Sequence, residues 1–472
     1  MRVLHNPRVR AKTAMPILQR LESGIDRLRS SATDADFESL ERQLHELFVI
    51  AEREVLGEEL ERLDIDLPSV MIDGQAHYRV LRSTETYTSA VGPITVGRTL
   101  YRCGRSAAVV PLELRAGIVS GHWTPVAARQ ALLMVAHVTP GEAERLFREL
   151  GGMSPSKSSL DRLPKGVSER WEAQREVFEA TLRSQLEVPA LATTVSVSLD
   201  GVMTPMKDGE RGAVRARQRA DGKRTKGPAG YREVGCATLS FHDAAGERLS
   251  TVRFARMPEA NKTTLKTMLA RELAEVLERQ PELTLVKVAD GAKDNWSYLH
   301  EELPEGVEVV DFFHAVSHLK TAFDAAYGEN SPQALSQFSK YRHVLRDDPD
   351  GVEKVIRALL YLRKCHPRRR AISTELGYFR RHRRRMCYGE LAVHNLPIGS
   401  GVVEASCKTL VTQRMKRSGM RWRHDGGQAI LTLRSLIQSG RFETGWTLLS
   451  QTYTAEISPP ENVVAFSRPR TH

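Results

Sequence analysis

Three acidic residues combine a residue type and a local setting that suit metal-dependent chemistry. Asp200 and Asp290 each end a strand-like run, and Glu404 follows a Gly-Ser-Gly tripeptide, at the expected first turn of a helix. Hard cations take oxygen ligands. Two such ions can activate an attacking water and stabilise a leaving oxygen during in-line attack on a phosphodiester. The three carboxylates therefore predict a site for two Mg²⁺ ions, with Mn²⁺ as an alternative ion.

Each carboxylate also has an ordinary explanation when it is taken singly. An aspartate followed by glycine, as at Asp200 and Asp290, is typical of a turn. Most of the 58 acidic residues of the chain are expected at the solvated surface. Glu404 is expected near the positive end of its helix, behind an N-cap at Ser400, and this position favours an ionised carboxylate.

The elements that must position these residues follow an alternating pattern. We expect strands at 195–200, 233–242, 249–256, 283–289 and 307–311, with a helix over 260–279. The apolar run 283–289 is typical of a central strand that is covered on both faces. The order βββαβαβα predicts an α/β fold in which helices flank a mixed five-stranded sheet. Residues 314–390 are expected to be mainly helical.

Several motifs follow one another along the second half of the chain. They are Ser198–Val202 (SLDGV), Ala289–Ala292 (ADGA), Asp311–Ala315 (DFFHA), Pro397–Ala405 (PIGSGVVEA), Cys407-Lys408 and Arg414–Trp422 (RMKRSGMRW). Together they resemble the DDE transposases of bacterial insertion sequences, most closely the ISKra-type group, which is related to Mutator-like transposases. The resemblance is strongest from about 193 to about 436.

The resemblance implies an RNase H-like catalytic core with a DDE triad of catalytic, metal-binding residues at Asp200, Asp290 and Glu404. It also implies a supporting role for Asp311 and His314, which match a C/D-x-x-H motif. The implied activity is binding of insertion-sequence ends, followed by two-metal-dependent DNA cleavage and strand transfer. The implied partners are double-stranded DNA, as element ends and target, and further copies of the chain in a homo-oligomer.

Composition and the first half of the chain also favour a nucleic-acid partner. The net charge is +11, and a basic protein neutralises DNA phosphates and releases their counterions. Helix starts with a hydroxyl residue before proline recur at 124–125, 139–140 and 154–155. They predict either a helix-turn-helix or an ordinary helical bundle. In a helix-turn-helix, Lys157 and Arg162 would face DNA.

Further DNA contacts are expected from other basic segments. Residues 207–232 are predicted to form a loop between strands, and 368–385 are rich in arginine beside two aromatic residues. For each segment a merely solvated surface is the alternative. Trp422 is expected either to stack on a base or to anchor the end of a helix. The candidate DNA-binding residues in these and the C-terminal motifs are Arg215, Arg217, Arg381, Arg384, Lys408, Arg414, Lys416 and Arg421.

The sequence suggests a division into four parts. They are a helical region at 1–66, a β-hairpin and helix-turn-helix region at 67–190, the catalytic domain at 191–440 with a helical insertion at about 320–395, and a tail at 441–472. Five scattered cysteines without a C-x-x-C pair argue against a disulfide framework. No apolar run approaches the roughly 20 residues that span a bilayer. We therefore expect a bacterial cytoplasmic protein without a membrane partner, which associates with the nucleoid when it binds DNA.

Other functions remain open on the sequence. An RNase H-like nuclease would hydrolyse DNA without joining it, and a domesticated DNA-binding protein would keep the fold but lose mobility. A structural scaffold is disfavoured by the clustered arginines.

Overall fold

The structure is a computed structural model of the chain. It describes residues 7–31, 36–207, 209–223 and 230–459, so the end of the expected tail, 460–472, lies outside the described residues. The chain divides into two compact units, Met1–Arg170 with Trp446–His472, and Trp171–Gly445. The four-part division expected from the sequence stays a prediction.

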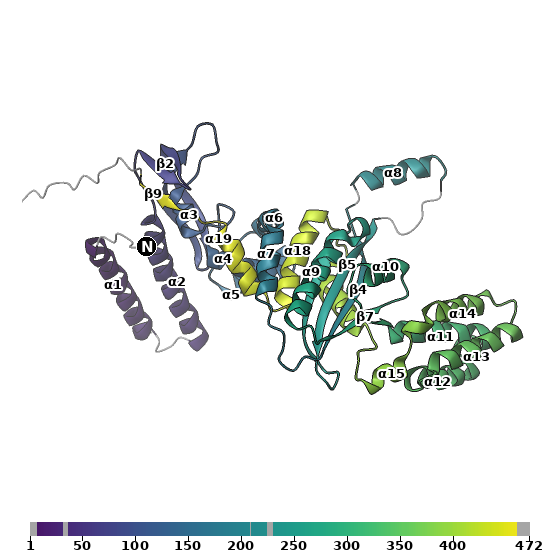
Figure 1. The fold of residues 1–472 in the computed structure, drawn as a ribbon. Coiled ribbons are helices and arrows are strands. Elements are labelled where there is room, and N and C mark those ends of the chain that lie inside the picture. The colour runs from purple at the N-terminus through teal and green to yellow at the C-terminus, as the bar shows by residue number, and fades with distance from the viewer. Residues whose placement is uncertain (1–6, 32–35, 208, 224–229, 460–472) are drawn as a thin grey trace, which may run out of the picture. The chain divides into compact units, whose positions relative to one another are not determined.

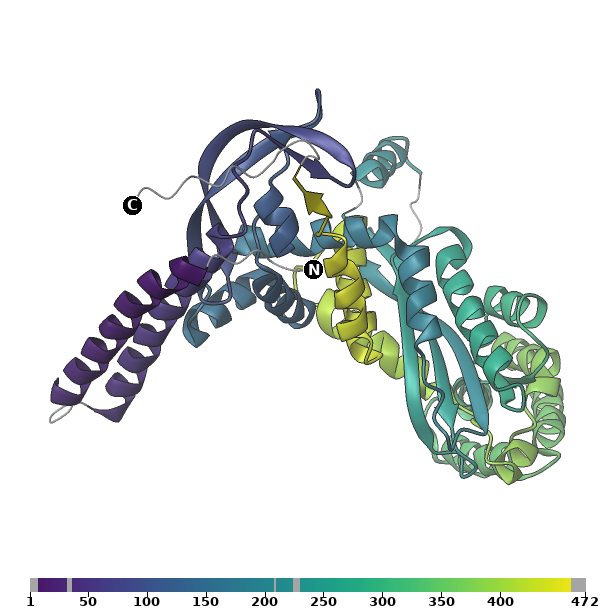
Figure 2. The same cartoon turned by 60° about the vertical axis from the view of Figure 1, so that its left-hand side comes forward.

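The first unit combines helices with a small antiparallel sheet (Figure 2). Its strands lie in the order β3-β2-β1-β9 and are β1 Ser69–Ile72, β2 Gln75–Ser89, β3 Gly92–Arg102 and β9 Ile457–Ser458. Its helices are α1 Pro7–Ser31, α2 Phe37–Glu61, α3 Pro111–Ala116, α4 Pro125–His137, α5 Pro140–Leu150 and most of α6 Lys157–Ala173, with most of α19 Phe442–Gln451. The hairpin of β2 and β3 lies within 67–190, the region in which the sequence predicted a β-hairpin.

The repeated pattern of a threonine or serine followed by proline marks the starts of α4 and α5. Thr139 caps α5 with a complete capping box to Glu142, and Pro125 and Pro140 occupy first-turn positions. The third helix differs, because α6 begins at Lys157 rather than at Pro155. The hydroxyl of Ser156 accepts a hydrogen bond from the Ser159 amide at 3.2 Å, so Ser156 satisfies the first turn.

The second unit is built on a mixed five-stranded sheet in the order β6-β5-β4-β7-β8 (Figure 1). The strands are β4 Thr194–Pro205, β5 Tyr231–His242, β6 Arg248–Arg256, β7 Thr284–Ala289 and β8 Val307–Val310. β4, β7 and β8 run parallel to one another, and β5 pairs antiparallel with both β4 and β6. The expected mixed sheet with flanking helices is confirmed.

Helices cover both faces of this sheet and extend beyond its β7 side (Figure 1). They are α7 Arg175–Ser184, α9 Thr263–Arg279, α10 Lys293–Glu301, α11 Phe312–Tyr327, α12 Pro332–Asp347, α13 Gly351–Cys365, α14 Arg370–His382, α15 Tyr388–Val393, α16 Gly401–Ser406, α17 Gln413–Met415 and α18 His424–Gln438. A further helix, α8 Gly209–Ala220, is drawn apart from the sheet in Figure 1. Short segments complete the unit: the 3₁₀ turns η1 Ala260–Lys262 and η2 Arg383–Arg385, and the π-helical turn η3 Cys407–Thr412.

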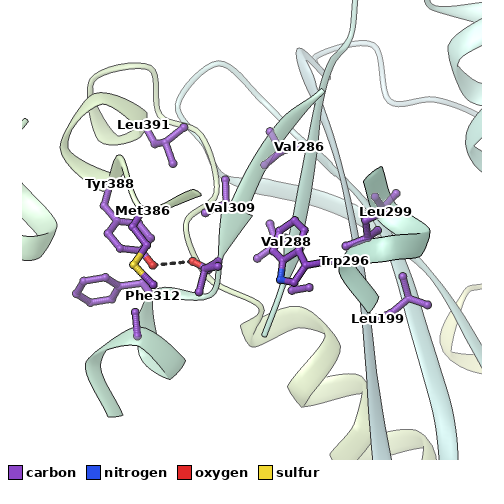
Figure 3. Packing of buried hydrophobic residues seen from close by; sticks show 14 of the residues in the cluster. Leu199, Val286, Val288, Trp296, Leu299, Val309, Phe312, Met386, Tyr388 and Leu391 are labelled. Atoms are coloured by element: carbon purple, nitrogen blue, oxygen red, sulfur yellow. Dashed lines mark hydrogen bonds between the residues drawn. The ribbon is translucent and has the colours of Figure 1, made fainter. Parts of the chain in front are cut away.

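A continuous apolar core joins the sheet to the helices that follow it. Figure 3 shows Val288 of β7 beside Trp296 of α10, with Val286 farther along the same strand, and Phe312 of α11 near Tyr388 of α15. The buried hydroxyl of Tyr388 donates to the carbonyl of Val310 at 2.8 Å, which joins α15 to the end of β8. The core therefore holds the carboxyl ends of the parallel strands in place.

The basic segment that was expected to be a loop contains a helix. α8 occupies Gly209–Ala220, between β4 and β5, and residues 224–229 lie outside the described part. Arg, Ala and Gln are good helix formers, and they outweigh the glycines of this stretch. Within the described residues, no helix is long and apolar enough to cross a membrane.

Candidate active site

Three aspartates lie at one level on or directly after neighbouring parallel strands. Asp290 and Asp311 directly follow β7 and β8, whereas Asp200, which was expected to end a strand, lies inside β4, because pairing with β5 continues to Pro205. Ser198 of β4 lies opposite Val288 of β7, and Ala289 lies opposite Val310 of β8. Continuing these registers places Asp200 beside Asp290, and Asp290 beside Asp311. The amide of Asp311 donates to the carbonyl of Ala289 at 2.9 Å, so pairing persists to this level. Adjacent strands are about 4.8 Å apart. The three residues therefore form a row at one edge.

The segment that carries Glu404 lies against the Asp200 face of the sheet. The thiol of Cys407, one turn after Glu404, lies 3.5 Å from Oδ2 of Asp200. Cys407 also packs with Cys236, the antiparallel partner of Asp200, in one apolar cluster. Residues directly opposite one another on paired strands share a face. Hence Glu404 and Asp200 approach the same edge from elements far apart in sequence.

Glu404 lies beside the third strand of the row. Its Oε1 is 3.8 Å from Nε2 of His314, and both side chains are partly exposed. Ligand atoms of Asp311, His314 and Glu404 all lie within 4.8 Å of one another. Ser400 occupies the expected N-cap position, but its side chain does not cap the helix. Its hydroxyl instead donates to Glu404 Oε1 at 3.3 Å.

Asp311 anchors the loop that leads into α16. It is fully buried, and its Oδ1 accepts a hydrogen bond from the His314 amide at 2.6 Å, which caps α11. Its Oδ2 accepts a hydrogen bond from the Ser400 amide. The neighbouring Phe312 amide donates to the carbonyl of Ile398 at 2.9 Å. The end of β8 thus sets where the helix of Glu404 begins.

Asp290 is oriented by the turn that opens α10. Its Oδ1 accepts hydrogen bonds from the Ala292 amide at 3.1 Å and from Nδ2 of Asn295 at 3.2 Å. Its backbone carbonyl accepts a hydrogen bond from the Trp296 indole at 2.6 Å. Oδ2 receives no hydrogen bond from the described residues, which leaves it able to bind a cation.

Among the residues that the structure describes, no lysine or arginine forms an ion pair with Asp200, Asp290 or Glu404. Burial above all, and also the charge of Asp290, raises the pKa of Asp200, although the Gly201 amide and the Cys407 thiol oppose this. Such uncompensated carboxylates fit oxygen-preferring divalent cations. Among the described residues, the possible ligands whose atoms lie together are Asp311, His314 and Glu404, and a metal site at Asp200, Asp290 and Glu404 stays a prediction.

Comparison with known proteins adds little to this geometry. No family model and no curated protein matches the chain. Among solved structures, the Drosophila P element transposase strand transfer complex is similar at a TM-score of 0.25 and 12% identity, over 72% of this chain and 87% of that chain. At this TM-score the similarity carries no argument, so the chemistry of the site is inferred from its residues.

A lysine that sequence patterns did not single out lies near Asp200. Lys262 and the preceding Asn261 both have left-handed backbone, with φ of 54° and 53°. This conformation is strained for residues other than glycine. Nζ of Lys262 pairs with Oε1 of Glu233 at 2.9 Å, and its positive charge lowers the pKa of Asp200. A left-handed residue pair has no reliable sequence signal without glycine.

The candidate DNA-binding residues occupy different environments. Arg414 is 2% exposed, so its guanidinium is not presented at the surface, and it lies over the ring of Trp422 at 5.1 Å. Arg215 is half-buried. The remaining candidates are exposed: Lys157, Arg162, Arg217, Arg381, Arg384, Lys408, Lys416 and Arg421.

Trp422 has the contacts of an anchor. Its indole donates to the carbonyl of Met415 at 2.9 Å, and its amide donates to the carbonyl of Pro205 at 3.0 Å. The ring is half-buried. Of the two roles expected from the sequence, these contacts support anchoring of the segment after α17 to the end of β4.

Proposed function

We propose that this chain is a DDE transposase that binds the ends of an insertion sequence and catalyses DNA strand cleavage and strand transfer. One observation carries the proposal. Asp200 and Asp290 lie at the same level on adjacent parallel strands, without basic partners among the described residues, and Glu404 reaches the same edge. The strand order, with an antiparallel β5 beside parallel β4, β7 and β8, supports an RNase H-like core.

We assign a separate role to the three carboxylates, to Asp311 and to His314. Asp200, Asp290 and Glu404 would hold two Mg²⁺ ions, and Mn²⁺ would be an alternative. The ions would supply Lewis-acid activation of a water or 3′-hydroxyl nucleophile and stabilisation of the leaving oxygen. Asp311 fixes the start of the Glu404 helix. His314, whose Nε2 is 3.8 Å from Oε1 of Glu404, would donate a hydrogen bond to a DNA phosphate at the edge of the site.

The exposed basic residues of the second unit suit a double-stranded DNA partner. Lys408 follows Glu404 by one turn and is exposed, so we propose that it contacts a phosphate next to the reacting one. Arg381, Arg384, Lys416 and Arg421 would contact flanking phosphates. In the first unit, Lys157 and Arg162 of α6 would bind the element ends. Cleavage and joining at paired ends would need a homo-oligomer.

The proposal is tested with purified protein, Mg²⁺ and labelled DNA that carries the repeats flanking its own gene. We expect wild type and a Glu390→Gln control to cleave and to join the strands, because Glu390 is an exposed residue of α15. We expect Glu404→Gln to lower the cleavage rate by at least about a hundredfold, since one metal ligand is lost, while DNA affinity stays unchanged.

Each alternative gives a different result in the same assay. Cleavage without joined product would identify a nuclease. Binding without cleavage by wild type would identify a DNA-binding protein that has lost its chemistry. Undiminished cleavage by Glu404→Gln would remove Glu404 from the site.

A further inference from the structure

Gly291, the residue after Asp290, lies directly against an aromatic ring of α14. A Cβ atom built on Gly291 would lie 2.4 Å from Cε2 of Tyr378 and 3.3 Å from its hydroxyl oxygen. The first distance is far below van der Waals contact, so any side chain at 291 would displace the ring or the turn. Helix α14 and the Asp290 turn therefore touch where only glycine permits it.

Tyr378 is itself held between two histidines. The ring of His318, from α11, stacks on it with centroids 3.7 Å apart, and the ring of His382 lies at 4.9 Å. His318 is fixed in turn by a 2.6 Å hydrogen bond from Nδ1 to Oε2 of Glu375. The Tyr378 ring thus cannot move away from Gly291 without disturbing both α11 and α14.

The same cluster contains buried polar atoms that the apolar core does not need. Among the residues that the structure describes, neither the Tyr378 hydroxyl nor either ring nitrogen of His382 has a hydrogen-bond partner. Burial, with the charges of Arg385 and Arg381, lowers the pKa of His382 to about 4 and keeps it neutral near pH 7. Unpaired buried polar groups are costly. Stability alone therefore does not explain their presence beside Asp290.

A second contact reaches the Asp290 turn from the residues that follow α14. The guanidinium of Arg385, in η2, lies 4.1 Å from the ring centre of Trp296. Its Nε is 2.6 Å from Oε2 of Glu308 on β8, which fixes the guanidinium over the ring. The indole of Trp296 donates to the Asp290 carbonyl. Arg385 thus restricts the position of the Trp296 indole, which in turn donates a hydrogen bond to the Asp290 turn.

We propose that α14 and η2 form a clamp on the Asp290 turn, in which Tyr378 and Arg385 are positioning residues for the metal-binding carboxylate. The clamp deepens the proposed function and rests on it. Tyr378 holds the turn at Gly291, and Arg385 holds it through Trp296. Side chains that orient a metal ligand set its affinity, because the ligand then loses less freedom when the ion binds.

The clamp is tested by Mn²⁺ binding, followed by the electron paramagnetic resonance signal of free Mn²⁺ in the absence of DNA. Mn²⁺ that binds to wild type but not to Asp290→Asn is counted as bound at this site. We expect Gly291→Ala to weaken Mn²⁺ binding by about tenfold. Gly377→Ala is the matched control, because a Cβ at that neighbouring glycine of α14 meets nothing within 4 Å. Thermal unfolding confirms that each variant is folded.

A double variant separates the clamp from a general disturbance of the turn. In a Tyr378→Ala background the ring is gone, so Gly291→Ala should weaken binding little further, and the two effects should not multiply. Arg385→Met, which adds no atoms to the turn, should weaken binding several-fold and serves if Gly291→Ala does not fold. Mn²⁺ affinity equal to wild type in a folded Gly291→Ala or in Arg385→Met, or fully multiplicative effects, would overturn the clamp.

The Mn²⁺ measurements also distinguish failure of the clamp from failure of the proposed metal centre. Suppose that wild type binds Mn²⁺, that Asp290→Asn does not, and that the clamp variants bind it like wild type. This result would overturn the clamp and leave the metal centre intact. Wild type that binds no Mn²⁺ would overturn the metal centre, and the clamp with it.

Discussion

Asp311 shows how one buried carboxylate serves two elements. Its two oxygens accept hydrogen bonds from amides at the start of α11 and at Ser400, before α16. A buried acceptor in this position has no substitute from solvent. Its sequence motif suggested a supporting role, and the contacts supply a physical reason: Asp311 determines where the chain that bears Glu404 leaves the sheet.

We predict that Asp311→Asn lowers both stability and activity. The amide keeps the side-chain shape, but its NH₂ group would face one of the two amide donors. The free energy of unfolding should fall by about 1–3 kcal/mol, measured by urea denaturation. Single-turnover cleavage should slow because Glu404 shifts. Asp294→Asn, at an exposed position of α10, is the control. Stability and cleavage like those of wild type would show that Asp311 does not anchor the loop.

At the scale of elements, the Glu404 segment is fastened by an irregular turn. The π-helical turn η3 leaves backbone carbonyls that a regular helix would pair. The buried Arg434 of α18 donates to the carbonyls of Thr409 and Leu410, the latter at 3.0 Å. Arg253 of β6 donates to the hydroxyl of Ser406 at 3.2 Å. The helix carrying Glu404 is thus tied both to α18 and to the sheet.

Trp422 also attaches the segment after α17 to the end of β4. Variants of Trp422 distinguish this anchoring role from stacking on a DNA base. Trp422→Phe should lose the bond to the Met415 carbonyl and about 1 kcal/mol of stability. Trp422→Ala should lose the ring as well and about 3 kcal/mol. Both are measured by thermal unfolding, beside Tyr361→Ala at an exposed aromatic residue. A Trp422→Ala variant with unchanged stability and weakened DNA binding would instead indicate stacking on a base.

At the scale of the whole molecule, basic residues are distributed over both compact units. The first unit presents Lys157 and Arg162 on α6, and the second presents exposed cations such as Lys408 and Lys416. The 368–385 run is divided between two roles, because Arg385 is engaged by Glu308 and Trp296 while Arg381 and Arg384 are exposed. Arginine density alone therefore does not mark a DNA surface.

We predict that a Lys157→Gln, Arg162→Gln double variant binds DNA more weakly and with less salt dependence. Each phosphate contact contributes about 0.9 to the slope of log affinity against log salt, so loss of two should lower the slope by about 2. Fluorescence anisotropy at several salt concentrations measures this. Mn²⁺ binding should not change. Arg148→Gln, on the exposed face of α5, is the control for net charge. An unchanged slope would favour the ordinary helical bundle.

Sequence patterns anticipated the five strands of the mixed sheet and most helices, because period-two alternation and capping residues are local signals. They ended the first of these strands at 200 rather than at Pro205, and they gave 441–472 as a tail although α19 and β9 lie there. They failed at α8, where glycines suggested a loop although the surrounding residues favour a helix. They also missed Asn295, Trp296 and Lys262. Each of these residues matters through contacts that depend on how the chain packs beside an aspartate, and no residue type in the sequence announces such a contact.

By itself the sequence determined the order of the elements, the mixed sheet and the presence of carboxylates on or directly after its parallel strands. The tertiary structure alone decided the strand register that sets Asp200 level with Asp290, and the tie from Asp311 to Ser400 that directs Glu404. It also decided that Tyr378 meets Gly291. The physical reason is that register and packing arise from contacts between distant segments, whereas sequence patterns report local preference.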